Sequence, residues 1–258
     1  QGGEEQMPGG ARDFLDTGAL RGVAAVMGLH VDPRADVGVL RSAAGPVMAG
    51  VNEFRIQVRG TGGHAAFPHA ARDPILAASH IVAALQQAVA RREDPMQPGV
   101  LSVCTIHGGT AFNVIPETVE MTGTVRSFRP DMNAFYDAIL EETASNVARA
   151  FGCEARVDVT HGYPPLTNDG DLLGPVREAA ASIFGAGLTP FEPVMGAEDF
   201  SLYTAQLPGF FAFLGCSAPE AAERWMLHHP RFRFDERALP YGAALLATLA
   251  LVGAAPRT

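Results

Sequence analysis

The order of hydrophobic patterns between residues 52 and 161 constrains the fold more than any other feature of this chain. Residues 53–59 alternate between apolar and polar side chains, which is typical of a half-buried strand. A helix is predicted from Asp73-Pro74, since proline favours the first helical position. One face of this helix is apolar and comprises Ile75, Ala78, Val82, Leu85 and Val89.

Four more elements complete the segment. We expect strands at 101–106, 119–125 and 155–159, and a helix from Pro130 to Gly152 with Phe135, Ile139 and Val147 facing inward. The predicted order is β-α-β-β-α-β, which is that of the ferredoxin-like unit.

The flanking segments read as α/β. The apolar run Val23–Leu29 is typical of a buried parallel strand, and we expect it to end at His30, before a turn that contains Pro33. Residues 172–184 and 238–252 predict helices, and 210–214 a buried strand. We therefore expect an α/β protein with a mixed or parallel sheet. Its discontinuous body comprises 1–51 and 162–258, and a ferredoxin-like lid at 52–161 is inserted into it.

Composition excludes several classes of function. The net charge of −9 argues against a nucleic-acid partner. All 19 basic residues are arginine, which excludes chemistry that needs a lysine. Three scattered cysteines make no disulfide framework. No apolar run is long enough for a membrane span. No signal peptide begins the chain, so we expect a cytoplasmic protein, although a preceding segment could hide an export signal.

Four short segments of the predicted body carry residues suited to metal chemistry. They contain Glu4-Glu5, His30, Glu198-Asp199 and His228-His229. Taken singly, each is more often structural. Together they supply the carboxylate and imidazole ligands that Zn²⁺ or Mn²⁺ prefer, and a second carboxylate that could act as a general base.

The predicted lid has candidates of its own. His64 follows a glycine loop, Asn113 lies in the segment Gly108–Pro116, and Arg126 lies on the polar side of a strand. These three side chains could hold an oxyanion and a carboxylate. The alternatives are a turn histidine, a capping asparagine and a solvated arginine.

Eight segments in order along the chain resemble those of a known superfamily. They are QGGEE (1–5), GLHVDP (28–33), GTGGHAAFPH (60–69), GGTAFNVIPE (108–117), GTVRSF (123–128), GYPPLTND (162–169), MGAEDFS (195–201) and LHHPRFRFDE (227–236). The chain resembles the dinuclear metallopeptidases and amidohydrolases related to aminoacylase and glutamate carboxypeptidase. The most similar branch contains hippurate hydrolase and the N-acyl-amino-acid and indole-acetyl-amino-acid hydrolases.

The resemblance implies a role for each matched residue. Glu4 would be the general base, and the metal ligands would be Glu5, His30 and His228, with His229 as an alternative to His228. His64 would reach the site from the lid of a partner subunit and stabilise an oxyanion. The remaining matched residues would bind substrate or line the site; they are Asn113, Arg126, Glu198 and Asp199.

The resemblance also implies cofactors and partners. An intact member would bind two divalent ions, of Zn, Mn, Co or Ni, and would form a homodimer through the lid. It would cleave small N-acyl amino acids, hippurate-like ones included, to a carboxylate and an amino acid.

Two departures weaken this expectation for the chain itself. Gly2-Gly3 stand where the family has Pro-Ala, and the family's upstream Cys-Gly-His segment has no counterpart here. The chain therefore resembles the C-terminal two-thirds of a member and would hold at most one ion weakly. The alternative is a non-catalytic module that dimerises or binds. A serine hydrolase is disfavoured because there is no G-x-S-x-G motif.

Overall fold

The computed structural model describes residues 9–253, and these divide into two compact units. The first unit comprises Gln1–Met48, Leu166–Val194 and Glu198–Thr258, so it is assembled from three stretches of the chain. The second comprises Ala49–Pro165 and the short segment Met195–Ala197. The chain is α/β with mixed and parallel pairing, as expected.

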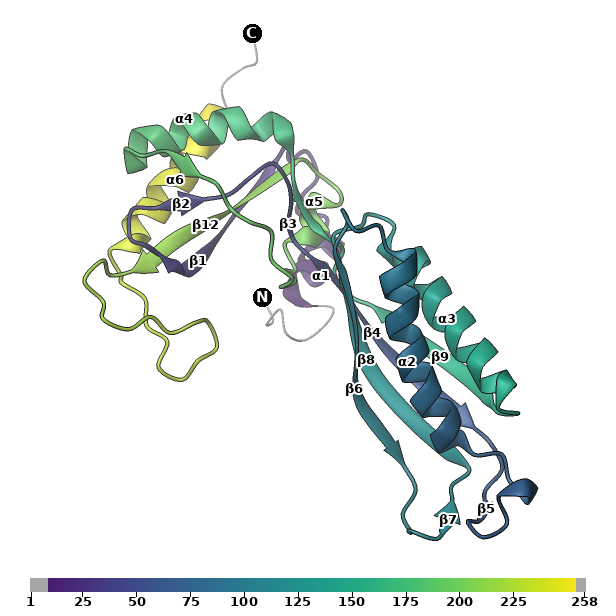
Figure 1. Cartoon of the computed structure of the whole chain (residues 1–258). Helices are drawn as coiled ribbons and strands as arrows, with labels where there is room; N and C mark the ends of the chain where they lie inside the picture. The colour runs from purple at the N-terminus through teal and green to yellow at the C-terminus, as the bar shows by residue number, and fades with distance from the viewer. Residues whose placement is uncertain (1–8, 254–258) are drawn as a thin grey trace. The chain divides into compact units, whose positions relative to one another are not determined.

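An antiparallel sheet of four strands forms the second unit (Figure 1). Its strands are β4 (Gly50–Arg59), β6 (Gly99–Gly108), β8 (Thr118–Ser127) and β9 (Glu154–His161). They lie in the order β6-β8-β4-β9, so β6 and β9 form the two edges. Helices α2 (Pro74–Arg92) and α3 (Met132–Ala150) pack together and against this sheet. Along the chain the order is therefore β-α-β-β-α-β.

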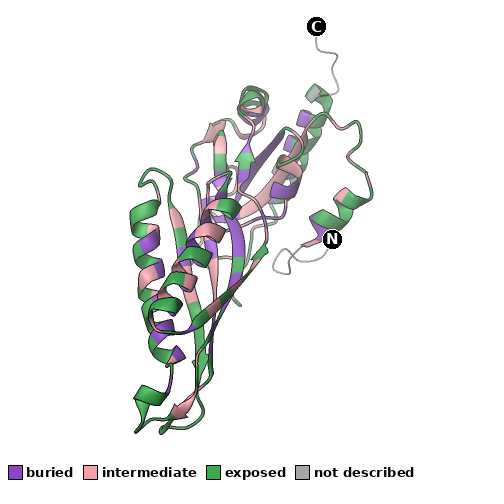
Figure 2. Cartoon of the chain, turned by 90° about the vertical axis from the view of Figure 1, so that its right-hand side faces the viewer, coloured by how far each residue is buried: buried purple, intermediate pink, exposed green. Residues whose placement is uncertain are grey.

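On both helices of the second unit most of the predicted inward face is buried, including Ala78, Leu85 and Ile139, but the buried set is wider than predicted. On α2 the buried positions include Ala77, Ile81 and Ala88, whereas Ile75 is 44% exposed. Val82 and Val89 are partly buried against the same core, so Ile75 alone of the predicted face of α2 is exposed. On α3 the buried set also extends beyond the prediction and includes Tyr136 and Leu140. Figure 2 shows exposed residues along the outer sides of both helices.

A mixed sheet organises the first unit. Its strands are β1 (Val26–Asp36), β12 (Gly209–Ser217), β2 (Leu40–Arg41) and β11 (Leu188–Thr189), in that order. The pairs β1–β12 and β2–β11 are parallel, and β12–β2 is antiparallel. Helices α4 (Leu173–Phe184) and α6 (Ala238–Gly253) contribute to the core on one face. No helix among residues 9–253 is long and apolar enough to cross a membrane.

Strand β12 is buried on both faces. Phe210, Ala212 and Leu214 belong to the core that contains α4 and α6, whereas Phe211 and Phe213 belong to a second cluster. Successive side chains of a strand point to opposite faces, so the second cluster marks the opposite side of the sheet.

Strand β1 is longer than predicted, because it does not end at His30. It pairs with β12 up to Asp32 opposite Gly215, and again at Asp36 opposite Ser217. Pro33 lies in the irregular stretch between these pairs, where a missing N–H donor costs little. The Ser217 hydroxyl donates a 2.6 Å hydrogen bond to the Pro33 carbonyl, which holds the irregular stretch to β12.

Smaller elements complete the two units. In the first unit, β3 (Gly45–Met48) pairs with β10 (Leu166–Asn168), and α1 (Gly9–Asp16) contacts α5 (Ser201–Thr204). In the second, β5 (Gly63–His64) pairs with β7 (Val114–Ile115).

Candidate active site

His30 lies on the face of β1 opposite helices α4 and α6. Its ring is 6.5 Å from that of Phe211 and 6.4 Å from that of Phe213, measured between centroids. The His30 Nδ1 atom lies 2.9 Å from the Val31 carbonyl oxygen. Because a carbonyl only accepts, Nδ1 is the donor in this bond, and the neutral ring carries its proton there. The Nε2 lone pair is then available for a metal ion.

Gly28 brings the loop that contains Glu198 and Asp199 onto the same face. A Cβ atom at Gly28 would lie 2.6 Å from Phe211 Cδ2 and 3.0 Å from Phe200 Cε2. Only glycine leaves room for both rings, whose centroids are 5.3 Å apart. Phe200 follows directly after Asp199, so its packing on β1 places both acidic residues on the side of the sheet that bears His30.

The two acidic side chains are buried and connected to the backbone. Glu198 is 7% exposed and Asp199 is 4% exposed. The Ala11 N–H donates a 3.0 Å hydrogen bond to Asp199 Oδ2, which ties the first turn of α1 to this loop. Burial and the nearby Asp199 charge raise the pKa of Tyr203. These contacts fit the expectation that both acids line or support the site, which itself stays a prediction.

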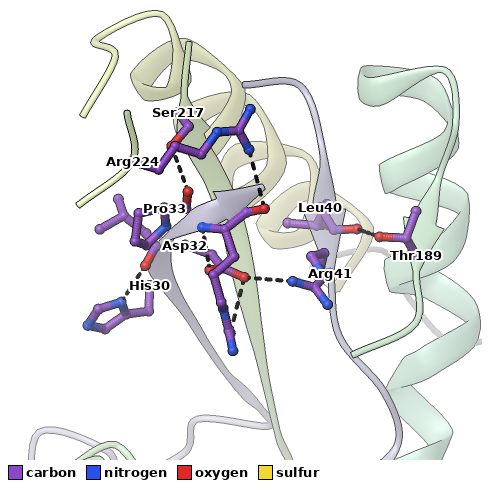
Figure 3. A network of polar contacts seen from close by, with 10 residues as sticks. His30, Asp32, Pro33, Leu40, Arg41, Thr189, Ser217 and Arg224 are labelled. Atoms are coloured by element: carbon purple, nitrogen blue, oxygen red, sulfur yellow. Dashed lines mark hydrogen bonds and ion pairs between the residues drawn. The ribbon is translucent and has the colours of Figure 1, made fainter. Parts of the chain in front are cut away.

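Asp32 forms the centre of a charged network beside His30 (Figure 3). Its carboxylate is 2% exposed and accepts hydrogen bonds from Arg34 Nε (2.8 Å), Arg34 Nη2 (3.2 Å) and Arg41 Nη1 (3.1 Å). Burial alone would raise the pKa of Asp32, but the hydrogen bonds from Arg34 and the charges of Arg34 and Arg41 lower it overall. Both guanidinium groups also lie within 5.5 Å of the Phe191 ring centroid.

The loop of residues 218–237 contains the adjacent histidines. His228 has a φ of 65°, a left-handed conformation that is uncommon outside glycine. The His229 ring stacks on Trp225 at 4.2 Å, and its Nδ1 accepts a hydrogen bond from the Arg231 N–H at 3.1 Å. The His229 ring is held by these contacts within the loop, and the choice of His228 as the ligand stays a prediction.

The second unit carries the other three candidates. His64 is exposed, and its Nδ1 accepts a 3.0 Å hydrogen bond from the Ala66 N–H. A neutral His64 therefore carries its proton on Nε2, where it can be donated. The Ala65 N–H donates to the Asn113 carbonyl oxygen at 3.0 Å, which brings Asn113 beside the His64 strand. Arg126 Nη1 donates to the Met195 carbonyl oxygen at 3.2 Å, so part of its hydrogen-bonding capacity is used.

The candidates separate into groups. His30, Glu198 and Asp199 share one side of the sheet in the first unit, and His64 and Asn113 lie together in the second. Within residues 9–253, no three His, Cys, Asp or Glu side chains are grouped closely enough to hold a metal ion. Glu4 and Glu5 lie outside the described residues. The predicted roles of these two glutamates and of the ligand set are therefore still predictions.

The sequence prediction missed the packing residues of this site. Gly28 and Phe200 determine where the acidic loop lies, and Arg34 with Arg41 balances the buried Asp32. A glycine inside an apolar strand, two residues before a histidine, was the available signal, because such a glycine often marks a close approach by another group.

The comparisons with known proteins concern the whole described fold. The sequence profile of peptidase family M20/M25/M40 matches residues 1–252. The N-acetylcysteine deacetylase of Bacillus subtilis is 38% identical over 96% of this chain, and the Arabidopsis thaliana IAA-amino acid hydrolase ILR1-like 4 is 36% identical over 95%. A crystal structure of a B. subtilis dinuclear metal-binding peptidase of the M20 family superimposes with a TM-score of 0.80 and 34% identity, over 94% of this chain.

This chain spans 64%, 57% and 61% of the lengths of these three proteins, respectively. The family match extends over nearly all of its residues and agrees with the α/β fold and mixed sheet. The chain belongs to peptidase family M20/M25/M40.

Proposed function

We propose that this chain is part of a metal-dependent amidohydrolase that cleaves small N-acyl amino acids, hippurate-like compounds included, to a carboxylate and an amino acid. Two relatives support this choice, because their names specify N-acetylcysteine and IAA-amino acids, both of which contain an amide between an acyl group and an amino acid. The structural observation that carries the proposal is the His30 ring, whose Nδ1–H is bonded to Val31 and whose Nε2 is left to bind a metal.

The donor chemistry fits divalent metal ions. His30 and His228 supply imidazoles, and Glu5 would supply a carboxylate, which is a combination that suits Zn²⁺ and Mn²⁺. A bound ion would polarise the amide carbonyl and lower the pKa of water. In this proposal Glu4 takes a proton from the attacking water and returns it to the leaving amine, while Glu198 and Asp199 support the site from the loop before α5.

His64 stabilises the oxyanion of the tetrahedral intermediate. The hydrogen bond from Ala66 to its Nδ1 supports this role, because it leaves an Nε2–H donor on an exposed ring. Asn113 lies beside the His64 strand and offers an exposed amide that can bind substrate, with Arg126 as a less available companion. We propose that these residues reach the site of a second subunit.

The second unit acts as an inserted ferredoxin-like lid and dimerisation domain. Its strand β6 is a sheet edge, and edge strands present unpaired backbone groups that can pair with another chain. Two apolar side chains on this edge, Val100 and Ile106, are 40% and 51% exposed. Sedimentation at micromolar concentration should give a dimer. A monomer would reject both the β6 interface and the action of His64 in a second subunit.

A non-catalytic module of the same family is the second candidate. It is favoured by the absence of a cluster of three potential ligands among residues 9–253. Metal analysis of a full-length version after dialysis distinguishes the two, because the present chain would hold at most one ion weakly. About two tightly held ions per chain, with hydrolysis of an N-acyl amino acid, support the amidohydrolase. No retained ion and no hydrolysis, from a chain that is folded and dimeric, support the module.

A further inference from the structure

The loop of residues 218–237 lines an open pocket of about 530 Å³ that none of the proposed catalytic roles uses. A volume of this size falls within the range of small-molecule sites. The pocket lies where the parallel strands β1 and β12 end, because Ser217, the last residue of β12, lines it. Ligands of α/β proteins gather at the carboxyl ends of parallel strands.

The charges around this pocket are positive overall in a chain whose net charge is −9. Three arginines line it: Arg224, Arg231 and Arg233. Arg224 forms an ion pair with the Asp36 carboxylate. The lining carboxylate of Asp235 is likewise held by Arg237, at 2.5 Å.

Among the described residues that line the pocket, two guanidinium groups and one carboxylate remain outside these two ion pairs. Arg231 and Arg233 form no ion pair within residues 9–253, and the opposing acid is the exposed Glu223. The rest of the wall includes apolar side chains, among them Ala218, Ala221 and Phe234. An anionic group attached to an apolar body matches this lining.

Arg231 is held in a conformation suited to such a group. Its Cζ atom lies 3.6 Å from the centroid of the Trp225 ring, on which His229 also stacks. A guanidinium stacked on an aromatic ring keeps its N–H groups at its edges, where a carboxylate can bind through two parallel hydrogen bonds.

The pocket adjoins the predicted metal ligand. Trp225 and Pro230 line it, and they lie three residues before and two residues after His228. Two residues of chain span at most about 7 Å, so a substrate could extend from His228 into the pocket. We propose that Arg231 and Arg233 bind the carboxylate of an N-acyl amino acid in this pocket. This inference rests on the proposed function for its substrate class.

The chain provides its own reporter for a binding test. Trp225 is its single tryptophan, so fluorescence excited at the red edge of indole absorption comes from the pocket wall alone. The purified 258-residue chain, freed of metal, is titrated with N-acetylphenylalanine and, separately, with the uncharged amide of the same compound, at constant ionic strength. We expect a saturable change in Trp225 fluorescence with the carboxylate and no change with the amide.

Variants assign the response to the pocket. Arg233→Gln should weaken the apparent affinity for the carboxylate about tenfold or more, since hydrogen bonds to charged groups are the strong ones. Arg177→Gln removes the same charge from an exposed position on helix α4 and should leave the affinity unchanged. Arg231→Lys keeps the charge but loses the planar donor pair, and should weaken binding as well.

Three results would overturn the proposal. They are no saturable response to the carboxylate, an equal response to inorganic phosphate or to the amide, and equal losses in the Arg177 and Arg233 variants. Because the titration contains no metal, it is separate from hydrolysis. Binding without turnover in the metal-loaded protein would support the carboxylate pocket and reject the amidohydrolase. Turnover without binding would support the amidohydrolase and reject the carboxylate pocket.

Discussion

Replacing Gly28 with alanine tests how the candidate site is built. The added Cβ would lie 2.6 Å and 2.9 Å from two ring carbons of Phe211 and 3.0 Å from one of Phe200. Ordinary carbon contacts are about 3.5–4.0 Å, so at its nearest contact the methyl group would be about 1 Å or more too close. Phe211 is 3% exposed and packed within the core, so the Phe200 loop is the part able to move.

The expected cost is that of overpacking, about 1–3 kcal/mol of unfolding free energy. Urea unfolding followed by Trp225 fluorescence measures it in the first unit, where that residue lies. With a urea slope of about 1–3 kcal/mol per molar, the midpoint should fall by roughly 1 M. The displaced Phe200 should also move Glu198 and Asp199 away from the His30 side of the sheet.

Gly174→Ala is the matched control. Gly174 lies in helix α4, where an added Cβ meets nothing within 4 Å. Alanine is the better helix former, so this change should leave stability equal or raise it by up to about 1 kcal/mol. Equal effects of the two substitutions, or a Gly28→Ala protein as stable as the parent, would refute the packing argument.

Three other predictions follow from single residues. Asp32→Asn should destabilise the first unit by about 1–3 kcal/mol in urea unfolding at pH 7, because Arg34 and Arg41 lose a charged acceptor. The folded pKa of Asp32 is lowered, so this loss should shrink as pH falls from about 4 through the folded pKa; a loss that is constant with pH would contradict it. In the native protein, a thiol reagent should modify exposed Cys104 first and buried Cys216 slowly, because burial raises the pKa of Cys216 to about 11; equal rates would be the opposing result. His64→Ala should lower kcat about 10²–10³-fold with little change in metal content, whereas an unchanged kcat would remove His64 from the reaction.

The sequence was informative wherever one hydrophobic pattern dominated. Val119, Met121 and Val125 alternate with polar residues, and all three are buried on β8 as that alternation predicts. Helix α2 was harder, because apolar residues occur around much of its circumference. Ala78 and Leu85 are buried as predicted, but Ala77 and Ile81 are buried beside them, and Ile75 is left exposed. Periodicity cannot rank two apolar faces of one helix.

The sequence identified candidate site residues by their type. Backbone hydrogen bonds in the structure decide which ring nitrogen of each histidine carries the proton. A histidine after an apolar strand indicated His30, yet only the Val31 carbonyl decides which ring nitrogen carries the proton. The same holds for His64, whose partner Ala66 lies two residues on. Residue type also could not distinguish His228 from His229 as the ligand, and that choice stays a prediction.

Turnover in a Glu4→Gln variant tests the central claim most directly, and the gene's complete product is the protein to use. Hydrolysis of an N-acyl amino acid is measured beside metal content, with Glu220→Gln, on the exposed loop after β12, as the control of equal charge. The amidohydrolase account predicts that Glu4→Gln loses at least about 10²-fold in kcat, retains its metal, and leaves the control fully active. A Glu4→Gln protein that hydrolyses the substrate at the parent rate would contradict it.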